Sequence, residues 1–142
     1  MRNIEMKMSD ITLDDILTPL AITVIIDQKV RDPELSAFTD QGIGLAELFE
    51  ISDINEDMVR DWYKTHAPDL SEKLRTKRRN TLVLRALTRF TEDVHIENVY
   101  DAMVAISVSD KEYHIEESDL IRSAATIWGF ERPPIKVDAR KD

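Results

Sequence analysis

Cysteine is absent from this chain of 142 residues, which contains only three glycines and five prolines. Without cysteine, no disulfide, thiolate metal site or cysteine nucleophile can form. A β-rich fold of this length needs many tight turns, and those turns use glycine and proline. The scarcity of both residues therefore predicts an all-α fold, a compact bundle of six or seven helices joined by short polar links.

Long hydrophobic runs are also missing. The longest strongly apolar stretch, residues 20–26, is far too short to span a bilayer. Residues 1–7 lack the apolar region that a secretory signal carries. We therefore expect a cytoplasmic protein without a membrane-spanning helix.

The motifs of common enzyme families are absent as well. The sequence has no glycine-rich phosphate-binding loop, no nucleophile elbow and no HExxH pair. The three histidines, His66, His95 and His114, lack the spacing of a zinc helix, so we expect them at the surface and not in a transition-metal site. A binding protein is therefore expected, not an enzyme.

Apolar residues recur at helical spacing along most of the chain. We expect a short helical opening over residues 11–17, then a buried helix over residues 20–26 that starts at Thr18-Pro19, and a further helix that opens at Asp32-Pro33. Gly42 and Gly44 mark either a close helix crossing or a break in that further helix.

A third helix is expected from Ser52-Asp53 to Ala67-Pro68, and further helical segments over residues 69–90, 97–109 and 115–128. Gly129 suits a left-handed position after the last helix, with Phe130 folding back as in a Schellman motif. Residues 1–130 are expected to form one domain, and residues 131–142 an extended or mobile tail.

A weak internal repeat relates residues 20–38 to residues 103–121, and it suggests two halves with pseudo-two-fold symmetry. In both segments an apolar helix ends in aspartate, a polar link of six residues follows, and glutamate lies in the first turn of the next helix. The four acids at these positions are Asp27, Glu34, Asp110 and Glu117.

An aspartate at the C-terminal end of a helix faces partly negative carbonyl groups, at a cost of about 0.3–1 kcal/mol. In one interpretation, Asp27 and Asp110 accept hydrogen bonds from N–H groups of the turn, and each glutamate complements the positive end of its helix. In the other, the four carboxylates and nearby carbonyls form an oxygen cage for Ca²⁺ or Mg²⁺.

Residues 104–117, VAISVSDKEYHIEE, followed by Leu120-Ile121 and the IWGF step at residues 127–130, resemble the signature of TerB-like proteins (tellurite-resistance protein B). Residues 21–34 resemble the same signature in the family's first half. The resemblance covers about residues 12–130, with Gln28 and Lys111 where the family has glycine. It implies an all-helical stress-response or tellurite-resistance module, with metal binding through acids between its two halves.

The net charge of −9 argues against general binding of nucleic acid, but residues 73–89 contain seven basic residues and no acid. This stripe predicts a surface that binds phosphate, an anionic lipid headgroup at a membrane surface, or an acidic protein partner. Alternatively, it forms a solvated helix face that pairs with acids of the same molecule. The candidate binding residues are Arg75, Arg78, Arg79, Arg85 and Arg89.

Overall fold

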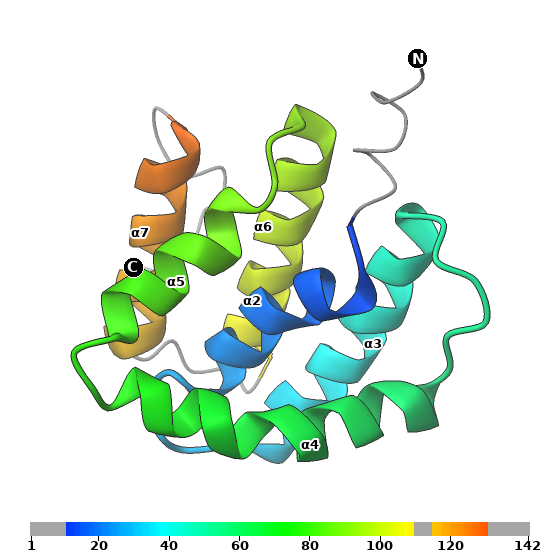
Figure 1. Ribbon diagram of the computed structural model, residues 1–142, viewed down its shortest axis with the longest axis horizontal. Coiled ribbons are helices and arrows are strands. Elements are labelled where there is room, and N and C mark those ends of the chain that lie inside the picture. The colour runs from blue at the N-terminus through cyan, green and yellow to red at the C-terminus, as the bar shows by residue number, and fades with distance from the viewer. Residues whose placement is uncertain (1–10, 110–114, 131–142) are drawn as a thin grey trace.

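The computed structural model describes residues 11–109 and 115–130, and these residues form six α-helices and no strand (Figure 1). The expected all-α fold is therefore confirmed. The predicted tail, residues 131–142, lies outside the described residues. In chain order the helices are α2 (Leu13–Ile25), α3 (Asp32–Leu48), α4 (Glu56–Leu74), α5 (Arg79–Thr88), α6 (Asp93–Ser107) and α7 (Ile115–Trp128).

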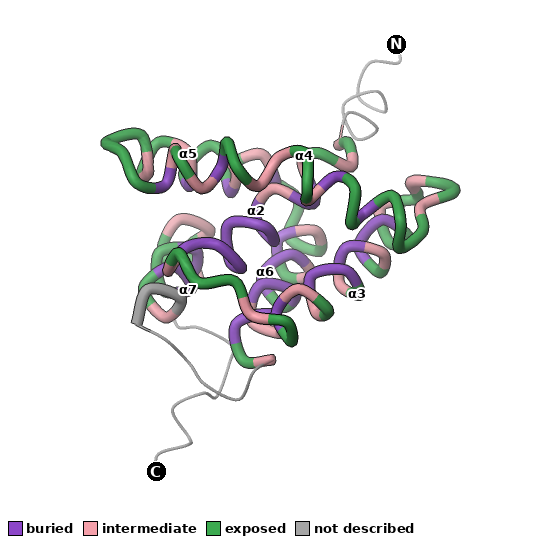
Figure 2. Tube along the Cα trace, turned by 90° about the horizontal axis from the view of Figure 1, so that it is seen from below, coloured by how far each residue is buried: buried purple, intermediate pink, exposed green. Residues whose placement is uncertain are grey.

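Helix α2 is the centre of the fold. It packs against α3, α4, α5 and α6, and Figure 2 shows it enclosed while the outer sides of α4 and α5 are exposed. Residues 19–26 are all buried. A helix that is apolar on every side must be surrounded by other helices to keep its whole surface away from water. The buried apolar side chains of all six helices form one cluster. No helix among the described residues is long and apolar enough to cross a membrane.

The predicted helical opening over residues 11–17 and the predicted helix over residues 20–26 are one continuous helix, so the separate start at Thr18-Pro19 was wrong. Thr12 caps α2, since its hydroxyl accepts a hydrogen bond from the Asp15 N–H at 3.3 Å and the Asp15 carboxylate accepts one from the Thr12 N–H at 2.9 Å. This reciprocal capping box satisfies two N–H groups of the first turn. Pro19 lies inside the helix instead of opening it.

The bounds predicted for the helix from Ser52-Asp53 to Ala67-Pro68 were also wrong. Helix α4 begins at Glu56, with Asn55 as its cap, and continues through Pro68 to Leu74. Residues 75–78 then turn the chain into α5, so the expected helical segment over residues 69–90 is broken. The guanidinium of Arg79 donates to the carbonyl of Leu74 at 3.2 Å and so satisfies one of the free carbonyls at the end of α4.

The two glycines of α3 differ in their surroundings, and neither breaks the helix. A Cβ atom added to Gly42 would lie 2.7 Å from Cδ2 of Leu17 on α2, whereas one added to Gly44 would meet nothing within 4 Å. Gly42 therefore marks a close crossing of α2 and α3.

Helix α7 ends in the predicted Schellman motif. Gly129 has φ of 83°, and the Phe130 N–H donates to the carbonyl of Ala125 at 2.9 Å. Helix α3 ends in the same way, with Glu50 at φ of 62° and the Ile51 N–H bonded to the carbonyl of Ala46 at 2.8 Å. The sequence repeat extends to these two helix ends, residues 48–51 and 127–130, if its first half holds four extra residues. The pseudo-two-fold symmetry of the repeat remains a prediction. Helix α3 packs on α6 and α4, whereas α7 packs on α6 and α5.

Candidate functional site

Asp27 lies in the turn between α2 and α3, as the sequence predicted. Its Oδ1 accepts a hydrogen bond from the backbone N–H of Lys29 at 3.0 Å. For Asp27, this bond confirms the interpretation in which an N–H group of the turn compensates the cost of an acid at the C-terminal end of a helix. Gln28 adopts φ of 64°, a left-handed conformation that favours glycine. The backbone thus keeps a glycine-like turn at the position where the TerB-like signature has glycine.

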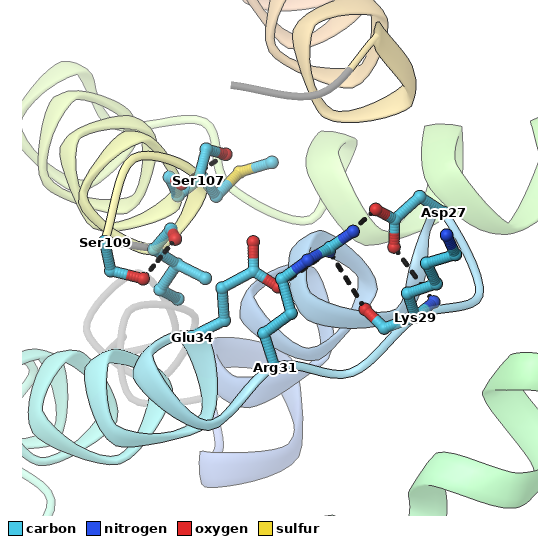
Figure 3. Close-up of polar contacts among 8 residues, drawn as sticks. Asp27, Lys29, Arg31, Glu34, Ser107 and Ser109 are labelled. Carbon is cyan, nitrogen blue, oxygen red and sulfur yellow. Dashed lines mark hydrogen bonds and ion pairs between the residues drawn. The ribbon is translucent and has the colours of Figure 1, made fainter. Parts of the chain in front are cut away.

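Arg31, the residue that precedes α3, joins the two predicted acids of this half (Figure 3). Its Nη1 lies 2.8 Å from Oδ2 of Asp27 and 3.6 Å from Oε1 of Glu34. The same nitrogen donates to the carbonyl of Lys29 at 3.1 Å. The structure therefore brings Asp27 and Glu34 around one cation, and that cation is a guanidinium group.

These charges are largely removed from water. The side chains of Glu34, Asp27 and Arg31 are 0%, 5% and 21% exposed. Glu34 is carried inward because it lies one turn before Phe38 on the buried face of α3. A buried carboxylate costs several kcal/mol unless it is paired, so Arg31 is part of what permits Glu34 to occupy this position.

Glu34 also acts on a residue of α4. Burial raises the pKa of the Tyr63 phenol above 10.0, and the nearby negative charge of Glu34 raises it further. An ionised phenolate here would be poorly solvated and would also face a carboxylate, so both effects favour the protonated phenol. Tyr63 of α4 packs edge-on against Phe38 of α3, with ring centroids 5.3 Å apart, so α3 and α4 meet through this pair.

The second half of the predicted cation cage is not placed. Asp110 lies outside the described residues, and of Glu117 only the backbone, in the first turn of α7, is described. The described part of the chain contains no group of three or more histidines and acids arranged to hold a metal ion. Sequence reasoning considered acids alone and missed Arg31, although its spacing of four from Asp27 and three from Glu34 was visible.

The histidines are not simple surface residues. His66 stacks on Trp62, with ring centroids 4.3 Å apart, and His95 packs on Phe49 at 4.2 Å. Both are half-buried, so the expectation of surface positions was too simple for these two. His114 lies outside the described residues.

The basic stripe divides into two groups. Three of its predicted residues contact the protein itself: Arg75 donates to the side-chain oxygen of Gln28 at 3.4 Å, Arg79 bonds to the end of α4, and Arg89 pairs with Asp15 at 3.2 Å. Intramolecular pairing therefore accounts for part of the stripe.

A second group of basic residues projects from the protein. Arg78 and Arg85, together with Lys77, are exposed and form no ion pair with any described residue. We call these three residues the basic corner. The first turn of α5 contains no acid, and no side chain caps it, so the positive end of the helix dipole adds to the charge of Lys77 and Arg78, whereas Arg85 lies in the last turn.

A groove of about 680 Å³ lies between α5 and α7, and more than half of its lining residues are polar, with Arg79 of α5 and Asp119 and Arg122 of α7 among them. Val83 and Leu84 line it from α5, Leu120 and Ile127 line it from α7, and Ile26 lines it from the end of α2. This volume falls within the range of about 300–1,000 Å³ that is usual for ligand sites.

Comparison with known proteins found no matching family model, no matching curated protein and no matching solved structure. The resemblance to TerB-like proteins thus remains a prediction from the residues that carry it.

Proposed function

We propose that this chain is a non-enzymatic helical binding module that recognises an acidic segment of a partner protein through its basic corner. The observation that carries the proposal is the exposure of Lys77, Arg78 and Arg85 within a stretch that contains no acid. Water solvates these exposed charges and weakens their mutual repulsion. A carboxylate-rich partner adds complementary charge, which favours the correct partner and speeds association.

An acidic protein is a better fit than nucleic acid. Affinity for nucleic acid depends on many phosphate contacts, and the chain has a net charge of −9 with only three basic residues in the corner. A short acidic segment needs only local complementarity, while the negative remainder of the molecule orients the approach of the partner.

The resemblance to TerB-like proteins suggests a setting for this module, namely bacterial stress response or tellurite resistance. Divalent-cation binding through Asp27 and Glu34 is a second candidate function. It is favoured by the convergence of both carboxylates on one cation. Ca²⁺ or Mg²⁺ would have to displace the Arg31 guanidinium, or be held with Asp110 and Glu117.

The test uses a fluorescent, glutamate-rich peptide without apolar residues, called here the polar acidic peptide, and measures binding by anisotropy. We expect Arg78→Glu/Arg85→Glu to weaken binding at least about tenfold, or 1.4 kcal/mol. We also expect wild-type affinity to fall as salt is added.

The matched control is Lys29→Glu/Lys64→Glu, which changes the net charge equally at two exposed lysines outside the corner. The control should lose less than about threefold, as expected for distant surface charges. Equal losses in the two double variants would mean that net charge, and not the basic corner, governs binding.

A further inference from the structure

We infer that a pocket between α3 and α4 binds a free aromatic amino acid. The pocket shares no residue with the basic corner, so this site adds a second ligand to the proposed binding module. Its volume is about 440 Å³, which falls within the range of about 300–1,000 Å³ that is usual for small-molecule sites. Three of the residues that line it are apolar or aromatic, and three are charged.

The apolar part of the pocket includes a pair of aromatic rings. Leu35 and Phe38 line it from α3, and Tyr63 lines it from α4. Phe38 is 1% exposed, whereas Leu35 and Tyr63 are half-buried, so the pocket lies at the edge of the core. The rings of Phe38 and Tyr63 pack edge to face, with their planes at 62°. A ligand ring can extend this pair through Tyr63, so an aromatic group suits the apolar part of the pocket.

The charged residues of the pocket are divided between its two helices. Helix α3 supplies Asp32, which is exposed in the first turn and pairs with no base in the described part of the chain. Helix α4 supplies Arg60 and Lys64, four residues apart and therefore on one side of the helix. Arg60 also pairs with Glu56 at 3.4 Å, but both side chains are 57% exposed, and such a surface pair contributes little.

The buried Glu34 adds to the negative charge on the α3 side. Burial, and then the negative charge of Glu34, raise the pKa of the Tyr63 phenol. The charge of Glu34 therefore acts on a residue that lines the pocket, although Arg31 lies 3.6 Å from the same carboxylate. The pocket is thus negative towards α3 and positive towards α4.

This division of charge identifies the class of ligand. A free amino acid carries an ammonium group and a carboxylate at neutral pH. Its ammonium group can face Asp32 while its carboxylate faces Arg60 and Lys64, so both charges meet a complementary one. An amine or a carboxylic acid alone would match only one side of the pocket. The aromatic side chain then packs against Leu35 and Tyr63.

The test is an NMR titration of the ¹⁵N-labelled protein with three ligands. L-Phenylalanine carries both charges, 3-phenylpropanoate lacks the ammonium group, and phenethylamine lacks the carboxylate. We expect saturable shifts of the backbone amide signals around Leu35 and Lys64. Phenylalanine should bind at least about threefold more tightly than either analogue, because each analogue loses one exposed charge contact.

Two variants assign the two charge contacts. Lys64→Gln should weaken the binding of phenylalanine and of 3-phenylpropanoate at least about threefold, and it should not weaken the binding of phenethylamine, which has no carboxylate. Asp32→Asn should weaken the binding of phenylalanine and of phenethylamine, and it should not weaken that of 3-phenylpropanoate. A general disturbance of the fold would weaken all three ligands together, so the pattern separates a charge contact from structural damage.

Lys29→Gln and Asp40→Asn are the matched controls. Each removes the same charge as one of the two variants, from an exposed residue that does not line the pocket. Both controls should bind all three ligands within about twofold of the wild type, as expected for surface charges outside the site.

Three results would overturn the inference. The first is the absence of saturable shifts at α3 and α4 with any of the three ligands. The second is equal affinity for all three ligands, which would mean that the charges of the pocket are not used. The third is an equal loss of binding in the controls and in the pocket variants. Binding of the polar acidic peptide is measured separately, so failure at this pocket leaves the basic corner untouched.

Discussion

The Arg31 guanidinium lies 2.8 Å from the Asp27 carboxylate and 3.6 Å from that of Glu34, and so connects the end of α2 to the first turn of α3. Glu34 is fully buried, and Asp27 nearly so. One cation therefore compensates two carboxylates that water hardly reaches. Two of the acids that the sequence identified as candidate metal ligands thus have a structural role in holding the α2–α3 turn.

Replacing Arg31 by methionine should destabilise the protein by about 3 kcal/mol, because removing one partner of a buried ion pair leaves an uncompensated charge. Urea unfolding measures this loss. Arg60→Met is the control, since Arg60 pairs with Glu56 at 3.4 Å on the surface, with both side chains 57% exposed. That variant should lose less than about 1 kcal/mol. Similar losses in the two variants would contradict the importance assigned to Arg31.

The Arg31→Met variant also tests the predicted cation site. If the acids can form an oxygen cage, Ca²⁺ or Mg²⁺ should raise the midpoint of thermal unfolding of this variant more than that of the wild type, since the ion replaces the missing positive charge. Adding Asp27→Asn to the variant should abolish the rise. No metal-dependent shift in Arg31→Met, with either ion, would remove Asp27 and Glu34 from the list of metal ligands.

Tyr63 should make the folded state less stable in alkaline solution. Because its pKa is raised above 10.0 in the folded protein, the unfolded chain loses the phenolic proton first. Stability is therefore unaffected by this group below pH 10 and falls as the pH rises from 10 through the folded pKa. Tyr63→Phe should lose less stability over this window in urea titrations at each pH.

The chain has three tyrosines, so the ionisation of Tyr63 is followed as the part of the ultraviolet phenolate absorbance that Tyr63→Phe removes. Glu34→Gln should lower the Tyr63 pKa without returning it to 10.0, because burial is the larger cause of the shift. A Tyr63 titration unchanged by Glu34→Gln would show that the carboxylate does not act on the phenol.

The two glycines of α3 should respond oppositely to alanine. Gly44→Ala should stabilise the protein by about 1 kcal/mol, since alanine is the better helix former and the added methyl group meets open space. Gly42→Ala gains the same propensity, but its Cβ would press on the buried Leu17. Overpacking costs about 1–3 kcal/mol, so we expect a net loss of up to about 2 kcal/mol, measured by the unfolding midpoint in urea.

The fold class and several helix ends could be predicted from the sequence because their causes are local. Residues 115–128 have helical spacing and are followed by Gly129, and the structure has α7 over the same residues. The start of α2 was missed because Thr12 and Thr18 both offer a capping hydroxyl, and only the first has an acid three residues later to complete the box.

The candidate site was harder to predict because it depends on neighbours that are distant in sequence. Leu84 is next to the buried Val83 on α5, yet it is 49% exposed. The burial of Glu34 likewise depends on the packing of α3 against α6 and α4. The spacing of residues along one helix does not show which of its sides other helices will cover.

The central position of α2 has a consequence for how the chain folds. One of its main partners, α6, follows about 70 residues later in the chain, so α2 is synthesised before that partner. Until α6 emerges from the ribosome, an apolar helix remains without its full cover and is prone to association with other nascent chains. The buried residues of α2 therefore gain their full cover only once α6 is available, and until then we expect chaperones to bind this helix.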